Sequence, residues 1–245
     1  MSTGTVLCIK GNEAIRYAAA HLANLGIPIT EKCAPDISHV LLSVPSFTTG
    51  DEYLAHLLGD LPDDVVICGG NLTSPLLEGY HYIDFLRDPD YLAANAAITA
   101  QCALQILENQ MGKLSDKEVL VIGWGRIGKC LTRLLEQQGA YVTVAARKPA
   151  DLAMIRALGG SAVSIDQATD KMDRFDAVVN TVPVLLYPNI PARSDAVLLE
   201  LASKAGMTGE NIIDARGLPS KMAPSKSGKL IAETFVRLTT ILTTI

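Results

Sequence analysis

The sequence predicts an α/β protein of two domains, each built around a parallel sheet. Short, continuous apolar segments alternate with helical patterns along most of the chain, as expected for strands that are covered by helices on both faces. At 245 residues the chain is long enough for two modest domains. Apolar residues make up 49% of it and aromatic residues only 5%, so Leu, Ile, Val and Ala must fill the interior.

The first half of the chain contains apolar segments that end at turn-forming residues. One segment ends at Lys10-Gly11-Asn12, another at Pro45 and a third at Gly69-Gly70. We expect strands at 5–9, 40–44 and 65–68, weaker strands near Thr73 and Tyr82, and helices at 14–25 and 51–58. This alternation predicts a small flavodoxin-like domain with a parallel sheet.

An alanine-rich stretch at 91–111 predicts a long helix between the two halves of the chain. Asp88-Pro89 is a typical helix start, because aspartate caps a helix and proline suits its first turn, and Gly112 ends the pattern. One expected face carries Ile98, Cys102 and Ile106, and another carries Gln101, Gln105 and Glu108. We interpret this stretch as a helix that connects two domains.

From Lys117 the alternation of strands and helices restarts with more regular spacing. We expect strands at 118–122, 141–145, 162–165, 177–180, 197–201 and 211–214, and helices at 126–138 and 150–158. Pro224 opens a last amphipathic helix that runs to about Thr240; in two-domain proteins such a helix often packs back on the first domain. The predicted organisation is a substrate-side α/β domain at 1–88, a connecting helix at 89–112, a second domain at 113–222 and a C-terminal helix at 223–245.

Charge and composition argue against several classes of protein. A net charge of −5 disfavours nucleic-acid binding, which requires a dense basic face. No apolar run approaches the ~20 residues that cross a bilayer and no export signal is recognisable, so we expect no membrane partner and a cytoplasmic location. The five cysteines form no C-x-x-C pair, which predicts reduced, mostly buried thiols and no metal site.

Gly123-Trp124-Gly125-Arg126-Ile127-Gly128 is the strongest motif in the sequence. It follows a Val-Leu-Val-Ile strand directly and opens a helix, which is the context of the dinucleotide-binding turn of a Rossmann domain. The glycines there provide a tight turn, close approach of the backbone to a diphosphate, and close contact between helix and strand. Free N–H groups and the helix dipole then hold the diphosphate. The alternative is a glycine-rich turn without a ligand.

The end of the next strand indicates which dinucleotide would bind. An NAD enzyme places Asp or Glu about 20 residues after the glycines, to hydrogen-bond the ribose 2′-hydroxyl. This chain has Ala146-Arg147-Lys148 there, with no acid before Asp151. Arg147 can grip a 2′-phosphate in a bidentate fork, and Lys148 adds a point charge. We therefore predict NADP in preference to NAD; the alternative is that both cations only solvate a loop.

Asn180-Thr181-Val182-Pro183 follows another predicted strand of the same domain. Open α/β sheets bind ligands at the carboxyl ends of their strands, and in dehydrogenases this segment usually lines the nicotinamide ribose and ring. We therefore include these four residues among the predicted cofactor contacts. A simple strand-ending turn built on Pro183 is the alternative.

Several segments together resemble the dipicolinate synthase family, whose NADP-dependent oxidoreductase component in spore-forming bacteria has two domains. The likeness covers most of the chain from about Ser43. It rests on Thr48-Thr49-Gly50, 95–102, the glycine turn, 145–147, 180–183, Leu201-Ala202-Ser203-Lys204, Gly217-Leu218-Pro219, Ala223-Pro224 and Gly228. The Leu-Ala-Ser-Lys and Gly-Leu-Pro segments are far more particular than the glycine turn, and they occur in the same order.

This resemblance implies a small N-terminal α/β domain, a Rossmann domain, and an active site in the cleft between them. It implies the oxidation of a dihydrodipicolinate-type ring, a cyclic dicarboxylate, to aromatic dipicolinate during sporulation, and it allows for a second synthase subunit. Homodimers are common for such folds, so fold-level analogy also predicts a homo-oligomer.

Two segments depart from the pattern of the family. The family typically has Gly-Gly-Asp-x-Arg after its first strand, where this chain has Lys10-Gly11-Asn12-Glu13-Ala14. Its connecting segment usually contains Asn-Ser-x-Pro-Thr-x-Glu-Gly, whereas here Gln101 replaces the carboxylate, so proton transfer by that acid is lost. Both changes fall on the half expected to hold substrate and leave the cofactor half intact.

Oxidation of such a ring requires groups that hold two carboxylates, for which Lys and Arg are suited. Lys204 and Arg216 follow predicted strand ends, and Asn95 and Thr99 could supply neutral hydrogen bonds. We predict Thr99 and Lys204 as catalytic residues and Asn95, Lys204 and Arg216 as substrate contacts, with Lys221 and Lys226 as further candidates. Each lysine could instead be a solvated surface residue, and Asn95 and Thr99 could only cap and turn the helix.

The histidines help to separate the alternatives. A D-2-hydroxy acid dehydrogenase needs a histidine late in or after the nucleotide domain to take the alcohol proton, but none follows His81. Three functions therefore remain open: a dipicolinate-synthase-type oxidoreductase, an oxidoreductase acting on another small carboxylate, or a non-catalytic NADP(H)-binding protein.

Overall fold

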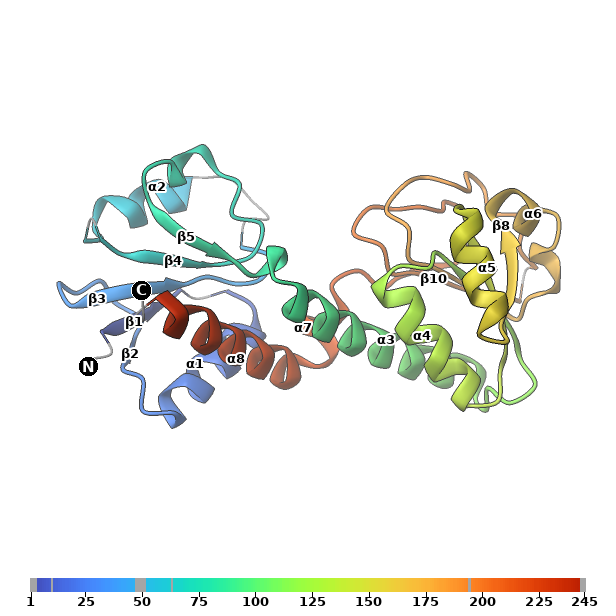
Figure 1. Cartoon of the computed structure of the whole chain (residues 1–245), viewed down its shortest axis with the longest axis horizontal. Helices are drawn as coiled ribbons and strands as arrows, with labels where there is room; N and C mark the ends of the chain where they lie inside the picture. The colour runs from blue at the N-terminus through green and yellow to red at the C-terminus, as the bar shows by residue number, and fades with distance from the viewer. Residues whose placement is uncertain (1–3, 10, 47–51, 63, 194, 243–245) are drawn as a thin grey trace. The chain divides into compact units, whose positions relative to one another are not determined.

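The computed structural model describes residues 4–9, 11–46, 52–62, 64–193 and 195–242 (Figure 1). The chain divides into two compact units, of which residues 1–95 and 219–245 make the first and residues 96–218 the second. Each unit has its own parallel sheet and hydrophobic core, so the predicted two-domain α/β class is confirmed. Within the described ranges, no helix combines the length and apolarity that a membrane span requires.

The first unit is built on a five-stranded parallel sheet. Its strands are β1 (Thr5–Cys8), β2 (Ile29–Thr30), β3 (Ile37–Leu41), β4 (Val66–Gly69) and β5 (His81–Asp84), in the order β2-β1-β3-β4-β5. Flavodoxin-like domains have this strand order, so the predicted arrangement is confirmed. Helix α1 (Glu13–Asn24) joins β1 to β2, and α2 (Glu52–Gly59) joins β3 to β4.

Side chains of β1 and of Ile9, which follows it, enter two separate cores on the two faces of this sheet. Val6 and Cys8 pack in the core that includes residues of α1, whereas Leu7 and Ile9 pack in the core that includes Leu57 of α2. Successive side chains of a strand point to opposite faces, and the two helices lie on opposite sides of the sheet (Figure 1). The sheet is therefore covered on both faces, as the continuous apolar strands predict.

The prediction of a strand near Thr73 is wrong. Asn71 has a positive φ of 62°, and a 3-10 helix begins at Pro75, which leaves no extended segment between them. The carboxylate of Asp84 accepts the N–H groups of Asn71 and Leu72, at 3.0 and 3.1 Å, in place of a strand ladder.

The other expected elements of this unit are present with shifted ends. The strand expected near Tyr82 is β5, and the strand expected at 40–44 is β3, which begins and ends three residues earlier. The helix expected at 51–58 corresponds to α2. Asp51 and the Thr48-Thr49-Gly50 segment of the family resemblance lie outside the described residues.

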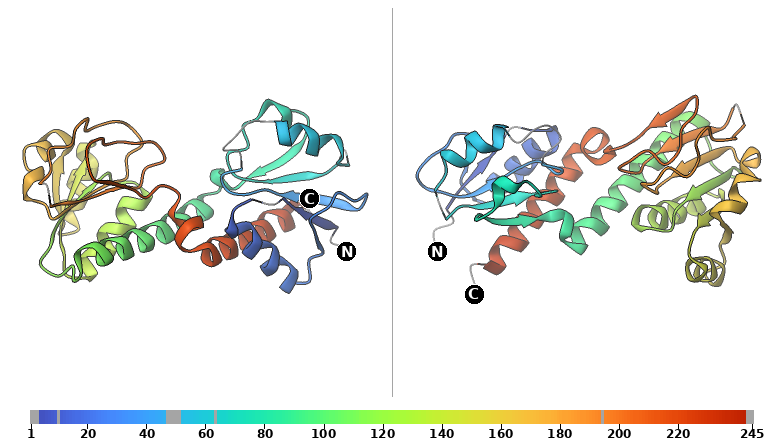
Figure 2. Two further views of the ribbon diagram at one scale, coloured as in Figure 1. Left: turned by 180° about the vertical axis from the view of Figure 1, so that it is seen from behind. Right: turned by 90° about the horizontal axis from the view of Figure 1, so that it is seen from above.

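The C-terminal helix α8 (Pro224–Leu242) belongs to the first unit and packs on α1 (Figure 2). A glycine at position 228 permits this contact, because a Cβ there would lie 2.5 Å from the carbonyl oxygen of Ala14 and 2.8 Å from the nitrogen of Ala18. Phe235 is buried in the same core. The expected return of the last helix to the first domain is thus confirmed. The short helix α7 (Leu218–Met222) that precedes it is not among the predicted elements.

The alanine-rich stretch forms a single helix, α3 (Pro89–Met111), and the boundary between the two units falls between Asn95 and Ala96 within it. Asp88 accepts the N–H of Tyr91 at 2.7 Å, which confirms the predicted cap. The residues expected on the polar face, Gln101, Gln105 and Glu108, are exposed. The buried face is centred on alanines, so Ile98 and Ile106 lie half-buried at its edge and not at its middle.

The second unit contains a six-stranded parallel sheet. Its strands are β6 (Glu118–Ile122), β7 (Tyr141–Ala146), β8 (Ser161–Ser164), β9 (Ala177–Asn180), β10 (Val197–Glu200) and β11 (Ile212–Asp214), in the order β11-β10-β9-β6-β7-β8. Helices α4 (Arg126–Gln137) and α5 (Pro149–Ala157) follow β6 and β7, and α6 (Ile165–Thr169) follows β8. Counted from β6, this is the 3-2-1-4-5-6 order of the Rossmann fold, with the switch point between β6 and β9.

The cysteines are mostly buried thiols, as predicted. Cys8, Cys68 and Cys102 are buried, Cys130 is half-buried and Cys33 is exposed, and none forms a disulfide. Burial raises the pKa of the Cys8 thiol to about 12, and it also raises the pKa of Cys68. These two buried thiols therefore stay protonated near neutral pH and act as small apolar residues.

Candidate functional site

The glycine turn lies between β6 and α4, at the carboxyl edge of the central strand of the second unit. Gly123 has a φ of +104°, a conformation that side chains rarely adopt, and its N–H donates to the carbonyl of Ala145 at 2.8 Å. A Cβ at this position would lie 2.5 Å from Oγ1 of Thr181 and 2.8 Å from a methyl group of Val182. Backbone conformation and packing therefore both require glycine.

The other two glycines of the motif have different surroundings. Gly128 lies in the first turn of α4, where a Cβ would overlap the carbonyl oxygen of Gly123, so helix and turn are in direct backbone contact. Gly125 caps α4, is exposed, and has no atom within 4 Å of where its Cβ would stand. The open side of Gly125 is where a ligand could approach the backbone, so the three positions match the three predicted roles.

The N-terminus of α4 is open to an anion. Among the described residues no side chain caps this helix, and none accepts from its first backbone N–H groups. Unpaired N–H groups and the positive end of the helix dipole together favour a phosphate at this place.

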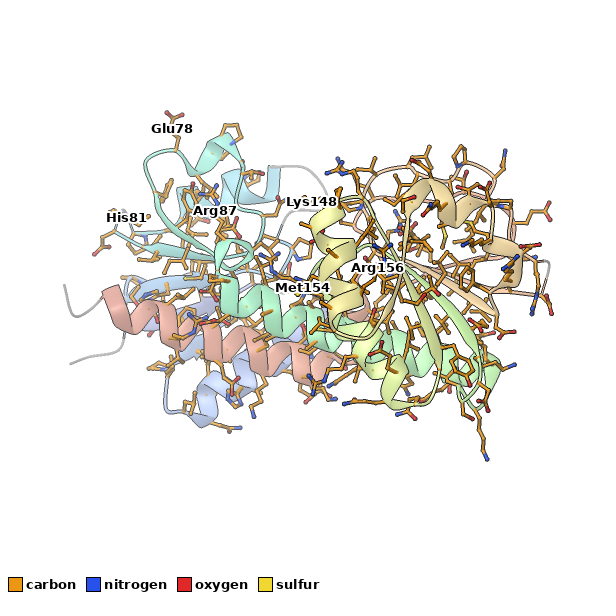
Figure 3. The ribbon with its side chains drawn as sticks, turned by 45° about the vertical axis from the view of Figure 1, so that its right-hand side comes forward. Glu78, His81, Arg87, Lys148, Met154 and Arg156 are labelled. Atoms are coloured by element: carbon orange, nitrogen blue, oxygen red, sulfur yellow. The ribbon has the colours of Figure 1, made fainter. Side chains whose placement is uncertain are left out.

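A cavity of about 350 Å³ adjoins the turn and is lined by part of the predicted cofactor contacts; the others, which do not line it, are Arg126, Ile127, Gly128, Asn180, Thr181 and Pro183. It is lined by Gly123, Trp124, Gly125, Ala146, Arg147, Lys148, Asp151, Ile165, Val182, Val184 and Leu186. Most of the lining is apolar, as in sites for planar ligands, and the charged side chains come from the end of β7 and the start of α5. Figure 3 shows Lys148 at that end of the helix.

The two cations at the end of β7 are available to a ligand. Arg147 and Lys148 are exposed, and no described carboxylate forms an ion pair with either. Asp151, one turn into α5, lines the same cavity and is half-buried. The cavity mouth thus has two unpaired cations and one acid.

The end of β9 is shaped by a buried carboxylate that the sequence reasoning missed. Asn180 is fully buried, and its Nδ2 donates to Glu200 at 2.8 and 3.0 Å and to the carbonyl of Val182 at 3.0 Å. Its Oδ1 accepts the N–H of Val182 at 3.1 Å. The Asn180 side chain therefore builds the turn from within, and Val182, half-exposed, faces the cavity in its place.

Glu200, the last residue of β10, is only 3% exposed and accepts hydrogen bonds from four donors. Besides Asn180, these are the backbone N–H groups of Ala202 at 2.9 Å, Gly206 at 2.8 Å and Met207 at 3.2 Å. The strand register pairs Glu200 with Asn180, so the two polar side chains meet at one sheet edge. The signal in the sequence is an acid that directly ends the apolar run Val-Leu-Leu, next to a strand that ends in Asn.

The predicted catalytic and substrate residues have different surroundings within their own units. Lys204 is exposed on the loop that Glu200 holds, whereas Thr99 is buried in α3 with 5% of its surface exposed. Arg216 forms an ion pair with Asp214, which raises the pKa of its guanidinium, with Nε 2.7 Å from the carboxylate. Asn95 is half-buried and belongs to the first unit.

The remaining candidates lie near the end of the chain. Lys221 is exposed on α7 and Lys226 is exposed in the first turn of α8, so both belong to the first unit. Among the residues that the structure describes, no group of His, Cys, Asp or Glu side chains has the arrangement of a metal site.

Sequence comparison finds relatives that match only part of this chain. No protein-family model matches it. Over 136 residues, which are 51% of this chain and 46% of the relative, it is 30% identical to the A subunit of dipicolinate synthase from Bacillus subtilis strain 168. Over 96 residues, 38% of this chain and 24% of the relative, it is 32% identical to glutamyl-tRNA reductase of Methanopyrus kandleri strain AV19. The chain thus spans less than half the length of these curated relatives.

Structural similarity extends over the whole chain. The crystal structure of the A chain of dipicolinate synthase from Bacillus subtilis matches with a TM-score of 0.81. The match covers 100% of this chain and 98% of that chain at 20% identity. At this identity the likeness shows the fold alone. The fold and the glycine turn define a two-domain α/β protein with a Rossmann-type second domain. This chain resembles the A subunit of dipicolinate synthase in both sequence and structure.

Proposed function

We propose that this protein is an NADP-dependent oxidoreductase of the dipicolinate synthase type, acting in the cytoplasm on a cyclic dicarboxylate that resembles dihydrodipicolinate. The observation that carries the proposal is the glycine turn, in which Gly123 and Gly128 are required by backbone contacts while Gly125 faces open space. A glycine at this place lets the backbone of the turn approach a diphosphate closely, which a side chain would obstruct. The similarity to the A subunit of dipicolinate synthase supports the choice of substrate class.

The chain offers a distinct group for each part of the nucleotide. Backbone N–H groups at the start of α4 would hold the diphosphate, and the apolar cavity wall at Ile165, Val184 and Leu186 would hold the adenine. Arg147 and Lys148 would hold a 2′-phosphate, and their lack of ion pairs within the described structure supports NADP over NAD. Val182 would face the nicotinamide, on a turn held by Asn180 and Thr181.

NADP supplies the hydride acceptor when it is bound, and the protein supplies the geometry for the ring oxidation. Thr181 donates from Oγ1 to the carbonyl of Ile122 at 2.8 Å, which fixes the end of β9 to the end of β6. Lys204, on the loop after β10, is the cation that we assign to a substrate carboxylate, with Arg216, Asn95 and Thr99 as the remaining candidates. We further propose that the protein acts as a homo-oligomer, with or without a second synthase subunit.

Two observations favour the alternatives, which are an oxidoreductase for another small carboxylate and a non-catalytic NADP(H)-binding protein. Gln101 is exposed on α3 at the position where the family has a carboxylate, and an amide cannot transfer the proton. The ion pair between Arg216 and Asp214 also reduces the positive charge available to an anionic substrate.

The nucleotide site is tested by calorimetric titration of NADP and NAD into wild type, Gly125→Ala and a control, Gly59→Ala. Both glycines have open space at the Cβ position and ordinary φ angles, so both variants should fold, but only the first places a methyl group at the diphosphate. We expect Gly125→Ala to weaken NADP binding at least tenfold, about 1.4 kcal/mol, and Gly59→Ala to leave it unchanged. Equal losses in both variants, or no binding by wild type, would refute the site.

The cofactor and substrate are tested separately. Arg147→Ala should remove most of the preference for NADP over NAD, and equal affinity of the wild type for both would refute the NADP assignment. Ultraviolet detection of dipicolinate from an enzymatically generated dihydrodipicolinate-type substrate then tests the reaction, with and without a partner subunit. Nucleotide binding without hydride transfer to NADP from any of a panel of carboxylates would favour the non-catalytic alternative.

A further inference from the structure

A second cavity of about 520 Å³ lies on the second unit between α4 and α5, apart from most of the nucleotide site. We call it the α4–α5 groove. It is lined by Trp124, Lys129, Cys130, Thr132, Arg133, Glu136, Val142, Val144, Met154, Ile155, Leu158, Gly160 and Ser161. Its floor is apolar, since Val142 and Val144 of β7 and Ile155 of α5 are buried beneath it.

Large apolar side chains on one wall of the groove are exposed. Met154 and Leu158, one helical turn apart on and just after α5, have 57% and 71% of their surface exposed (Figure 3 labels Met154). Isolated exposed apolar residues are ordinary, but here two adjoin a hollow with an apolar floor. Covering this patch with apolar atoms would be favourable.

A buried hydroxyl in the groove lacks a partner. Thr132 is only 4% exposed, and its Oγ1 has no hydrogen-bond partner among the described residues. Buried polar groups in folded proteins are nearly always hydrogen-bonded, so the floor of the groove is unusual at this position.

The other wall of the groove carries charges that are not neutralised within the chain. Lys129, Arg133 and Glu136 are spaced four and three residues apart, so they share one face of α4. None forms an ion pair with a described residue; Lys129 only stands over the ring of Trp124, with Nζ 5.8 Å from its centre. The two like charges one turn apart disfavour the isolated helix, which suggests that their partner lies elsewhere.

We propose that the α4–α5 groove is a dimer interface, in which α4 of each copy lies antiparallel in the groove of the other. The charge pattern of α4 is self-complementary: a two-fold axis between Thr132 and Arg133 places Lys129 of one copy opposite Glu136 of the other, and the reverse. The same axis places Arg133 of one copy opposite Thr132 of the other, near the centre of the contact. Met154 and Leu158 are then covered by the neighbouring helix.

A second copy fits these observations better than a small apolar ligand. A ligand on the floor would leave Lys129 and Glu136 unpaired at the rim, whereas an isologous contact pairs these two opposite charges. The interface rests on the homo-oligomer of the proposed function and supplies its contact. It is independent of the nucleotide site and the substrate, so a monomeric protein would leave the proposed reaction open.

Sedimentation velocity of the full chain over a dilution series, without nucleotide, tests the interface. We expect wild type to form dimers, and Lys129→Glu and Glu136→Lys each to raise the dimer dissociation constant at least tenfold. The double variant Lys129→Glu/Glu136→Lys restores opposite charges across the two-fold axis and should return to within about threefold of wild type. Lys171→Glu and Glu210→Lys, at exposed positions away from the groove, are the matched controls and should leave the constant unchanged.

Every outcome of this experiment decides the proposal. A monomeric wild type, single variants that dimerise as well as the controls, or a double variant that stays monomeric would each overturn it. Trp124 gives an independent reading, because it is the one tryptophan in the sequence and lines the groove. Its emission should shift to longer wavelength on dilution of wild type, in step with dissociation, and should not change with concentration in the monomeric single variants.

Discussion

Replacing Glu200 by glutamine tests whether the buried carboxylate holds the site together. Glu200→Gln keeps the size of the side chain but removes its charge and turns one acceptor into a donor. The glutamine oxygen can take the place of Oε2 and still accept from Gly206 and Met207. Its NH2 group then faces two donors that used Oε1. Nδ2 of Asn180 can still donate to the oxygen in the Oε2 position and to the carbonyl of Val182, whereas the N–H of Ala202 has no other acceptor.

The expected cost follows from these contacts. A buried donor left without an acceptor costs about 1–3 kcal/mol. Hydrogen bonds to a charged group contribute about 1.5–3 kcal/mol and neutral ones about 0.5–1.5 kcal/mol, so the two retained bonds each weaken by about 1 kcal/mol. Together these terms predict a loss of about 4 kcal/mol in the free energy of unfolding of the second unit.

Urea titration followed by Trp124 fluorescence measures this loss, because the single tryptophan lies in the second unit. With a urea dependence of about 2 kcal/mol per molar, the midpoint should fall by about 2 M. Glu210→Gln is the matched control, since Glu210 is exposed on the same unit and should change stability by less than about 0.5 kcal/mol. A midpoint for Glu200→Gln within about 0.5 M of the control (about 1 kcal/mol) would refute the reasoning.

Three further predictions concern the turn and the first unit. Gly128→Ala should destabilise the second unit by about 1–3 kcal/mol, because the new Cβ would overlap the backbone carbonyl of Gly123. It should also abolish nucleotide binding; urea titration measures the first effect and calorimetry the second. Asp88→Asn keeps the helix cap but loses the ion pair with Arg237, at 2.5 and 3.1 Å, and should cost about 0.5–1 kcal/mol at pH 7 because the arginine is 38% exposed. Arg237 lowers the pKa of Asp88, so this difference is present above the ordinary aspartate pKa and should vanish as the pH falls below about 4, measured by urea titrations at both pH values. Burial lowers the pKa of His39, whose ring centre lies 5.4 Å from that of Phe235. The free energy of unfolding of the first unit should therefore fall as the pH drops below about 6.5, the ordinary histidine pKa. His39→Phe should flatten this pH dependence, measured by circular-dichroism melts.

The fold could largely be predicted from the sequence because its signals are local. Continuous apolar strands that end at glycine or proline indicate a covered parallel sheet, and Asp88-Pro89 marks the start of α3. The strand expected near Thr73 is absent because Asp84, thirteen residues after Asn71, takes the N–H groups that a strand would use. A hydrogen bond of that kind depends on tertiary structure, and no local pattern announces it.

The candidate site divides in the same way. The glycine turn is one continuous segment, and Arg147 and Lys148 are neighbours in the sequence. A short motif can therefore reveal each of them. The pair of Asn180 and Glu200 forms only when β9 and β10 become neighbours, so neither residue stands out alone. Arg216, which the sequence suggests for a substrate carboxylate, is paired with Asp214 two residues away, and this short-range partner competes with any substrate.

The contacts at the sheet edge also explain why the fold is shared over the whole chain although the sequence identity is low. The hydroxyl of Thr181 joins β9 to β6, and Glu200 joins β10 to β9, through hydrogen bonds to buried backbone or buried side chains. A frame held by backbone groups and a few buried side chains tolerates change at most other positions, so the fold extends over the whole chain at 20% identity. The side chains that would choose a ligand, Arg147, Lys148 and Lys204, are instead exposed on loops attached to this frame. They can change without cost to the fold, so the substrate must be established by measurements on these loops and not from the frame.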